Sequence, residues 1–316
     1  MLDIVQVSDL HLSPTHAWFQ DNYDVFIDEM QADPPDFIFV TGDVCVNGPD
    51  RDWEFEFACQ QLARLPVPWR AIPGNHDAGD TPPDERNNHP LTEPLRQRFI
   101  DTVDADWWAE DLANWRFIGL NAQLIDSGLP NEPEQWAFLE AALADAGDRR
   151  LAIWLHKPLF VRDPDSTGRM LTALFPQGRR RVMALCEQHS VALVGSGHLH
   201  RYRRQRIGET RLIWAPATSF LMGARKGLPG VARLGYMRYR FSRSSFTAQF
   251  VEPPLFVNLD VRNWNKFRGS TIHLPERGLR SPVHSSPNSR NSSANSGGRA
   301  SVSVSARSGG ASSGLK

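Results

Sequence analysis

Short apolar segments alternate with longer amphipathic segments along most of the chain. Segments rich in β-branched and aromatic residues, each bounded by turn residues, predict strands at 4–7, 37–40, 69–72, 117–120, 151–155 and 191–194. Amphipathic stretches with helix-start signals predict helices at 22–32, 51–65, 133–146 and 179–190. Alternation of this kind indicates an α/β fold in which helices cover both sides of the strands.

The pattern changes after residue 211. Three further strands are expected at 212–214, 236–241 and 246–251, with no long helix between them. Strands joined without crossover helices are typical of antiparallel sheets, so we expect an antiparallel second half. Pro253 and Pro254 are expected to close the compact domain.

The end of the chain has a different composition from the rest. Residues 281–316 contain 13 serines and no aromatic or acidic residue. Such a segment buries too little apolar surface to offset its conformational entropy. We therefore expect one folded domain over residues 1–267 and a disordered Ser/Arg/Gly-rich tail over residues 268–316. A dispensable tail is the preferred interpretation, and contact with RNA, a membrane or an acidic partner is the alternative.

The net charge of −1 combines two unlike parts. From Arg268 onward there are seven Lys or Arg and one Glu, so residues 1–267 carry −7. An acidic domain argues against strong nucleic-acid binding. The chain has no apolar run of about 18 residues and no export signal after Met1, so we expect no membrane span. The three cysteines are far apart, and we expect a cytoplasmic protein in a reducing compartment.

Five predicted strands are each followed within four residues by Asp, Asn or His. The blocks are Asp9-Leu10-His11, Gly42-Asp43, Gly74-Asn75-His76-Asp77, His156, and Gly197-His198-Leu199-His200. Open α/β sheets bind ligands at the carboxyl ends of their strands, so we expect these side chains to converge. Asp9 and His11 are two residues apart, as are His198 and His200. In extended backbone that spacing points both side chains to the same side.

The donor atoms in these blocks predict a metal centre. Two Asp, one Asn and four His are more ligands than one metal ion takes, which suggests two ions sharing a carboxylate. Mixed oxygen and imidazole donors without cysteine favour Mn, Fe, Zn or Co. Two such ions can activate a hydroxide and bind both the attacking and leaving oxygens of a phosphoryl displacement. Phosphoester hydrolysis is therefore the predicted chemistry.

The ordered series of five blocks resembles the calcineurin-like metallophosphoesterase family, over most of residues 1–220. The resemblance implies a four-layer αββα sandwich with a dinuclear metal centre. It implies that the first metal is bound by Asp9, His11 and His200, that Asp43 bridges, and that the second metal is bound by Asn75, His156 and His198.

The resemblance also implies two catalytic residues. His76 would stabilise the transition state or protonate the leaving oxygen, and Asp77 would orient the His76 imidazole. A proton donor of this kind suits a leaving alkoxide, because imidazole titrates near neutrality.

Segments 215–219 and 229–234 resemble bacterial class III cyclic-nucleotide phosphodiesterases and glycerophosphodiesterases. That branch commonly has a second His after the ligand His, whereas this chain has Lys157. Lys157 would either supply charge to phosphate oxygens or be solvated.

The expected substrate is a small phosphodiester, either a 3',5'-cyclic nucleotide such as cAMP or a glycerophosphodiester, with attack by a metal-bound hydroxide. The alternatives are a phosphomonoesterase, a nuclease, and a non-catalytic scaffold of the same fold. A homodimer is also possible.

Several other residues leave two interpretations open. His89 is either a surface residue or a substrate contact in the polar loop 78–94. Arg179, Arg180 and Arg181 open a predicted helix, where cations oppose the helix dipole, and they either recognise phosphate or form a solvated face.

Overall fold

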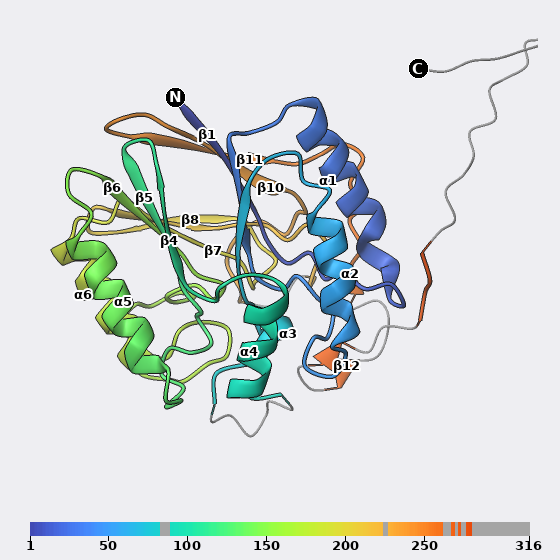
Figure 1. Ribbon diagram of the computed structural model, residues 1–316, viewed down its shortest axis with the longest axis horizontal. Coiled ribbons are helices and arrows are strands. Elements are labelled where there is room, and N and C mark those ends of the chain that lie inside the picture. The colour runs from blue at the N-terminus through green and yellow to red at the C-terminus, as the bar shows by residue number, and fades with distance from the viewer. Residues whose placement is uncertain (83–88, 224–226, 262–266, 269–270, 273–275, 280–316) are drawn as a thin grey trace, which may run out of the picture. The chain divides into compact units, whose positions relative to one another are not determined.

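The chain forms a compact unit from Met1 to Leu279. The computed structural model describes residues 1–82, 89–223, 227–261, 267–268, 271–272 and 276–279 (Figure 1). The compact unit ends later than the boundary expected at residue 267. Residues 280–316, which form most of the predicted tail, lie outside the described residues.

The first sheet has five strands in the order β11-β10-β1-β2-β3. Its strands are β1 (Leu2–Val7), β2 (Phe37–Thr41), β3 (Trp69–Ile72), β10 (Tyr236–Phe241) and β11 (Phe246–Val251). Strands β1, β2 and β3 are parallel, β10 is antiparallel to β1, and β11 is antiparallel to β10. The expected antiparallel pairing of residues 236–251 is therefore confirmed.

The second sheet has six strands in the order β4-β5-β6-β7-β9-β8. Its strands are β4 (Trp108–Leu112), β5 (Trp115–Gly119), β6 (Arg150–Trp154), β7 (Leu193–Ser196), β8 (Arg203–Ile207) and β9 (Thr210–Trp214). Strand β9 is antiparallel to β8 but parallel to β7, so the antiparallel arrangement expected for residues 212–214 is confirmed on one side of the strand and wrong on the other. The intervening strand β8 reverses the chain and allows β9 to pair in that direction. A separate antiparallel pair joins β12 (Phe267–Arg268) and β13 (Thr271–Ile272).

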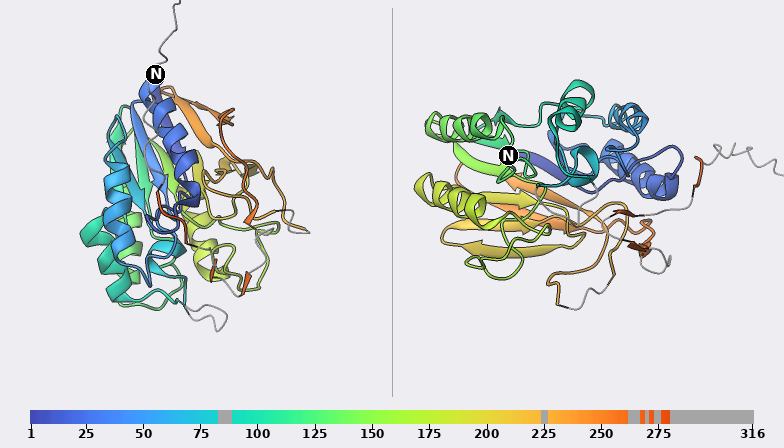
Figure 2. Two further views of the ribbon diagram at one scale, coloured as in Figure 1. Left: turned by 90° about the vertical axis from the view of Figure 1, so that its right-hand side faces the viewer. Right: turned by 90° about the horizontal axis from the view of Figure 1, so that it is seen from below.

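Helices cover the outer face of each sheet. They are η1 (Ala17–Phe19), α1 (Gln20–Ala32), α2 (Trp53–Leu62), α3 (Asn75–Ala78), α4 (Glu93–Thr102), α5 (Glu132–Ala144) and α6 (Pro176–Gln188). Apolar residues of α1 and α2 pack on the first sheet, and those of α5 and α6 pack on the second. Figure 2 shows the two sheets between these helices. The predicted four-layer αββα sandwich is confirmed.

The two sheets pack against each other through aromatic side chains. Phe39 of β2 stacks on Trp108 of β4 with ring centroids 5.3 Å apart, and it lies 5.2 Å from the ring of Trp154 of β6. All three side chains are buried in one cluster with residues of both sheets. This packing fixes the parallel strands of the two sheets relative to each other.

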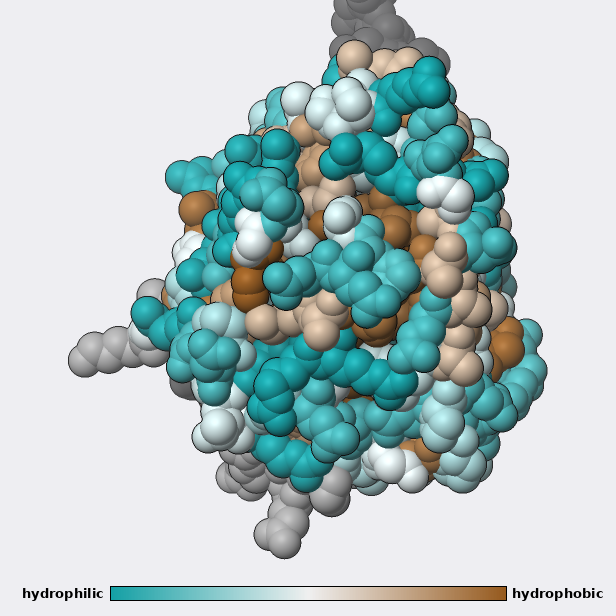
Figure 3. Space-filling model, turned by 90° about the vertical axis from the view of Figure 1, so that its left-hand side faces the viewer, coloured by the Kyte–Doolittle hydropathy of each residue, from teal (hydrophilic) through white to brown (hydrophobic). Residues whose placement is uncertain are grey.

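The side of the molecule that carries α5 and α6 is mainly hydrophilic, with hydrophobic residues visible in hollows between polar ones (Figure 3). Helix α6, for example, buries Val182 and Leu185 while Arg180 and Arg181 are exposed. No helix in the described part of the chain is long and apolar enough to span a bilayer.

Candidate metal centre

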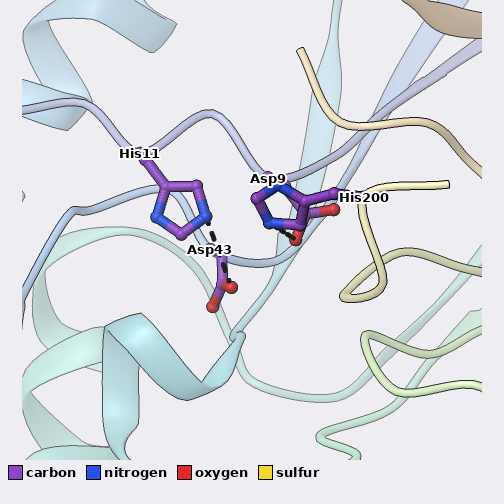
Figure 4. A group of neighbouring side chains, drawn as sticks. All are labelled: Asp9, His11, Asp43 and His200. Carbon is purple, nitrogen blue, oxygen red and sulfur yellow. Dashed lines mark ion pairs between the residues drawn. The ribbon is translucent and has the colours of Figure 1, made fainter. Parts of the chain in front are cut away.

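The loops that follow the parallel strands bring the predicted ligands together. One group consists of Asp9, His11, Asp43 and His200, and a second consists of Asp43, His156 and His198. Within each group, one ligand atom per residue lies within 4.8 Å of the others. Figure 4 shows the first group, in which the His11 and His200 imidazoles face the carboxylates of Asp43 and Asp9. Asp43 belongs to both groups, as expected for a bridging residue.

Asn75 joins the second group. It begins the short helix α3, and its side-chain Oδ1 lies 3.3 Å from Nε2 of His156. The structure thus places all seven predicted ligands at one edge of the two sheets, although their binding of metal stays a prediction.

Left-handed backbone, rather than extended backbone, produces this convergence. The φ angle is positive at Asp9 (56°), His11 (47°), Asp43 (54°), His198 (70°) and His200 (51°). Strand β1 ends at Val7 and β7 ends at Ser196, before the paired ligands begin. The expectation that extended backbone points the two ligands of each pair to the same side is therefore wrong. Left-handed non-glycine residues are uncommon, and they persist where the surrounding structure holds them.

Three histidines are oriented by backbone carbonyl groups. His156 Nδ1 lies 2.8 Å from the Thr41 carbonyl, His198 Nε2 lies 3.0 Å from that of Leu171, and His200 Nδ1 lies 2.6 Å from that of Phe220. A carbonyl oxygen only accepts, so each of these ring nitrogens donates its hydrogen. In a neutral imidazole the other nitrogen then carries a lone pair, which is what a metal ligand requires.

That second nitrogen faces the centre in each case. His156 Nε2 is 3.2 Å from Asp43 Oδ2, His200 Nε2 is 3.3 Å from Asp9 Oδ1, and His198 Nδ1 is 3.2 Å from His156 Nε2. Two imidazole lone pairs this close repel each other unless a hydrogen or a cation lies between them, and a metal ion bound by both rings would satisfy them.

His11 provides the strongest test of whether a metal fits. Its side chain is buried, and neither ring nitrogen has a hydrogen-bond partner among the described residues. Its Nε2 lies 3.6 Å from Asp43 Oδ2. A buried polar group without a partner is costly, and a cation coordinated by the imidazole would satisfy it. The chemistry of the donors and this unsatisfied imidazole both fit a metal ion.

Burial and neighbouring charges shift the pKa values of the cluster. Burial, and then His76, lowers the pKa of His11 well below its ordinary value, and burial and then His156 do the same for His198. Burial opposes the charged form of His156, but the charge and hydrogen bond of Asp43, the charge of Asp9 and the Thr41 carbonyl together raise the pKa of His156 to about 9. Burial would raise the pKa of Asp43, yet His156 and His76 hold it well below its usual range. Neutral His11 and His198 beside an ionised Asp43 are suited to coordination.

Two glycines allow the loops to approach this closely. A Cβ atom on Gly74 would lie 2.1 Å from Asp43 Oδ1, and one on Gly197 would lie 1.8 Å from Ser8 Oγ and 2.7 Å from Asp9 Oδ2. No side chain fits at either position without moving a carboxylate of the cluster.

His76 lies at the rim of the cluster. Its ring is 4.7 Å from that of His11, its backbone N–H donates to Asp43 Oδ1 at 2.8 Å, and its Nδ1 donates to the Val46 carbonyl at 2.7 Å. The imidazole is thus oriented by a backbone carbonyl.

The expectation that Asp77 orients His76 is therefore wrong. The buried Asp77 carboxylate accepts hydrogen bonds from the backbone N–H groups of Val44, Cys45 and Gly74, at 3.2, 2.9 and 2.8 Å. It ties the loop after β2 to the loop after β3, and so positions Asp43 relative to α3. Burial, and then the charge of Asp43, raises the pKa of Asp77 to about 6.

The environment of Lys157 fits neither of the two interpretations that the sequence left open. Its side chain is buried, and its ammonium contacts the Asp80 carboxylate and donates to Thr81 Oγ1 at 3.0 Å. It is neither solvated nor available to a phosphate, because an acid from another loop already neutralises it.

The remaining candidates have separate environments. His89 lies 3.2 Å from Asp50, and Arg181 pairs with Glu140 and stacks over Trp136. Arg179, by contrast, is buried. The carbonyl groups of Val46, Leu171 and Phe220, which orient histidines, were not predictable from the sequence. Every residue has a backbone carbonyl group, so the residue types do not show which carbonyl groups face the histidines. Only the folded structure shows this.

Comparison with known proteins agrees with this geometry. A family model described as calcineurin-like phosphoesterase matches residues 2–202. The chain belongs to this family. The resemblance predicted from the five sequence blocks is thus confirmed.

Two curated relatives of this chain are named as glycerophosphodiester phosphodiesterases. One, from Enterobacter lignolyticus, is 30% identical over 192 residues, which cover 58% of this chain and 63% of that protein. This chain therefore spans less than two thirds of that relative. The other, a probable enzyme from Arcobacter nitrofigilis, is 26% identical over 294 residues, covering 85% of this chain and 91% of that protein.

Solved structures share the fold. A purple acid phosphatase from yellow lupin seeds superposes with a TM-score of 0.58 at 15% identity, covering 82% of this chain and 52% of that one. Identity at this level shows the architecture only.

Proposed function

We propose that this chain is a metal-dependent phosphodiesterase that hydrolyses small phosphodiesters at a centre of two metal ions. The observation that carries the proposal is the pair of donor groups that share the Asp43 carboxylate. A shared carboxylate suits two ions lying close together in a phosphoryl-transfer site. Asp9, His11 and His200 would hold one ion with Asp43, and Asn75, His156 and His198 would hold the other.

Two bound ions would supply positive charge to the phosphate oxygens and would lower the pKa of a water nucleophile. The donor set fits Mn, Fe, Zn or Co, since it combines imidazole with hard oxygen ligands and lacks thiolate. Neutral His11 and the carbonyl-oriented His156, His198 and His200 are the residues of this chain that support such binding.

His76 is the proposed proton donor to the leaving oxygen. Its Nδ1 hydrogen is committed to the Val46 carbonyl, so Nε2 is the nitrogen that exchanges a proton with a bound ester. The carbonyl fixes the ring, and Nε2 has no hydrogen-bond partner among the described residues. An imidazole oriented in this way is an effective general acid. His76 is also partly exposed, as access to substrate requires.

A small diester is the substrate class that the other observations support. The two relatives named as glycerophosphodiester phosphodiesterases favour a diester. The charge of −7 on residues 1–267 disfavours a nucleic-acid polymer, because polymer binding draws on basic surface.

A substrate comparison tests the proposal. The full chain is loaded with Mn²⁺, and initial rates are measured on bis(4-nitrophenyl) phosphate, 4-nitrophenyl phosphate and single-stranded DNA at one metal concentration. We expect the bis-aryl diester to be hydrolysed fastest. Faster turnover of the monoester or of DNA would support a phosphomonoesterase or a nuclease instead. Two bound metals per chain with no turnover of any substrate would indicate a scaffold.

A further inference from the structure

A cavity of about 400 Å³ is lined by the residues on either side of Leu171, whose carbonyl group contacts His198 of the second donor group. It is formed by the loop before α6 and by residues 227–228, and its lining includes Met170, Thr172 and Arg179. Met170 and Thr172 flank Leu171, whose carbonyl accepts the hydrogen of His198 Nε2 at 3.0 Å. The wall of the cavity and the orientation of a predicted metal ligand therefore share one short segment. Cavities of this volume are typical of small-molecule sites.

The wall is apolar over much of its area. The contributing apolar side chains are Val161, Met170, Ala173, Leu174 and Leu228. Polar side chains make up the smaller part of the wall area, and they are Arg162, Asp163, Ser166, Thr172 and Arg179. One of them is already committed, since Arg162 Nε donates to the Gly227 carbonyl at 2.8 Å. An apolar wall with a few polar groups favours a ligand that is itself largely apolar.

Arg179 is the polar group with unmet bonding capacity. It is 2% exposed, and its Nε has no hydrogen-bond partner among the described residues. Among the described residues its terminal nitrogens form hydrogen bonds only to Ser166, at Oγ (3.4 Å) and at the carbonyl oxygen. It forms no ion pair within the part of the chain that the structure describes. Burial, and then Arg180, lowers the pKa of Arg179.

Asp163 and Asp165 act on Arg179 through their charge, but neither forms an ion pair with it among the described residues. A buried guanidinium with an unpartnered Nε therefore gains from an acceptor placed beside that nitrogen. An apolar wall with one such donor fits an aromatic ring that carries an acceptor atom. It suits a polyol less well, because Asp163, Ser166 and Thr172 could meet some hydroxyls while the larger, apolar part of the wall would leave others without their water partners.

We propose that this cavity holds one ester substituent of the substrate and selects an aryl or heteroaryl substituent bearing a hydrogen-bond acceptor over a glycerol-type substituent. The proposal rests on the proposed phosphodiesterase function. It makes Arg179 and the apolar wall the specificity-determining part of the site, distinct from the metal ligands and from His76.

Filling the cavity from its open side is the first test. Met170 is 44% exposed, so Met170→Trp adds volume without disturbing the core. We expect kcat/KM on bis(4-nitrophenyl) phosphate to fall about tenfold or more, and kcat/KM on glycerophosphoethanolamine to change less than about threefold. Arg179→Met should give the same pattern. Arg181→Met, an exposed arginine two residues along α6, is the matched control and should change neither rate.

A binding measurement separates this proposal from the proposed function. Saturation-transfer NMR with 4-nitrobenzyl alcohol, which has a ring and acceptors but no phosphate, should detect binding to the full chain and its loss in Met170→Trp. Binding without turnover of either diester would overturn the phosphodiesterase function and support the cavity assignment. Turnover of both diesters, with equal losses in Met170→Trp or no binding of the alcohol, would overturn the cavity assignment alone.

Discussion

Lys157 and Asp80 form an ion pair in which both side chains are buried. Lys157 directly follows His156, and Asp80 follows the helix α3 that carries Asn75 and His76. The pair therefore joins the two loops that supply the second donor group. Thr81 completes the arrangement by accepting from the ammonium at 3.0 Å.

Removing one member of this pair should destabilise the fold strongly. Lys157→Met leaves the Asp80 carboxylate buried without its partner, and we expect the free energy of unfolding to fall by about 3–5 kcal/mol. Urea denaturation followed by tryptophan fluorescence measures this change. The double variant Lys157→Met with Asp80→Asn should recover part of the loss. Glu209→Gln breaks the exposed pair with Arg206 and, as the control, should cost less than about 1 kcal/mol.

His76→Ala should separate catalysis from metal binding. We expect kcat on bis(4-nitrophenyl) phosphate to fall about 10²–10⁴-fold, because a general acid contributes on that scale. Metal content by atomic emission should remain near that of the unaltered chain. His189→Ala, at the C-terminal end of α6, is the control and should leave both values unchanged. Near-normal turnover by His76→Ala would refute the assigned role.

The shared position of Asp43 predicts unequal effects of ligand substitutions on metal content. Asp43→Asn alters both donor groups, so we expect loss of both ions after dialysis, whereas His198→Ala should lose one. Metal analysis per chain gives the count. Thermal unfolding with added Mn²⁺ gives a second readout, because a ligand that binds only the folded state raises Tm. Equal metal loss in the two variants would contradict a shared carboxylate.

Two truncations test the end of the compact unit. The Arg277 backbone accepts from Ala17 N–H at 2.9 Å and donates to the Thr15 carbonyl at 2.6 Å, and its guanidinium stacks over Trp18. A chain that ends at Leu279 should keep its stability and diester turnover. A chain that ends at residue 267 should lose about 1–3 kcal/mol of unfolding free energy, since it loses these contacts. Equal stability of the two truncated chains by urea denaturation would show that Arg277 contributes nothing.

The sequence predicted most of the sandwich and the convergence of the ligands, for identifiable reasons. Strands such as β2 and β6 are almost wholly buried, so their sequences are continuous apolar runs that are easy to recognise. Strand β8 was missed, because Arg203, Arg204 and Arg206 give it no strand pattern. The charged side chains of that edge strand extend to solvent or over neighbouring rings.

At the site, residue type and order identified the donors but not their supports. The partner of Lys157 lies 77 positions away in the sequence, and the Asp77 carboxylate binds backbone groups that any residue offers. Contacts of this kind depend on how loops meet after folding. The sequence motifs therefore predict which residues meet at the candidate metal centre, but they do not predict the contacts of Asp77 and Lys157.

The left-handed backbone at the five ligand positions restricts which substitutions the fold accepts. Each such position costs an L-residue with a Cβ on the order of 1–2 kcal/mol, and glycine avoids that cost. Replacing His11 or His200 with Gly would remove a donor and relieve strain in the same step. Variants that give up the site can therefore fold more stably than the original chain, so thermal stability is a misleading guide when libraries of this protein are screened for activity.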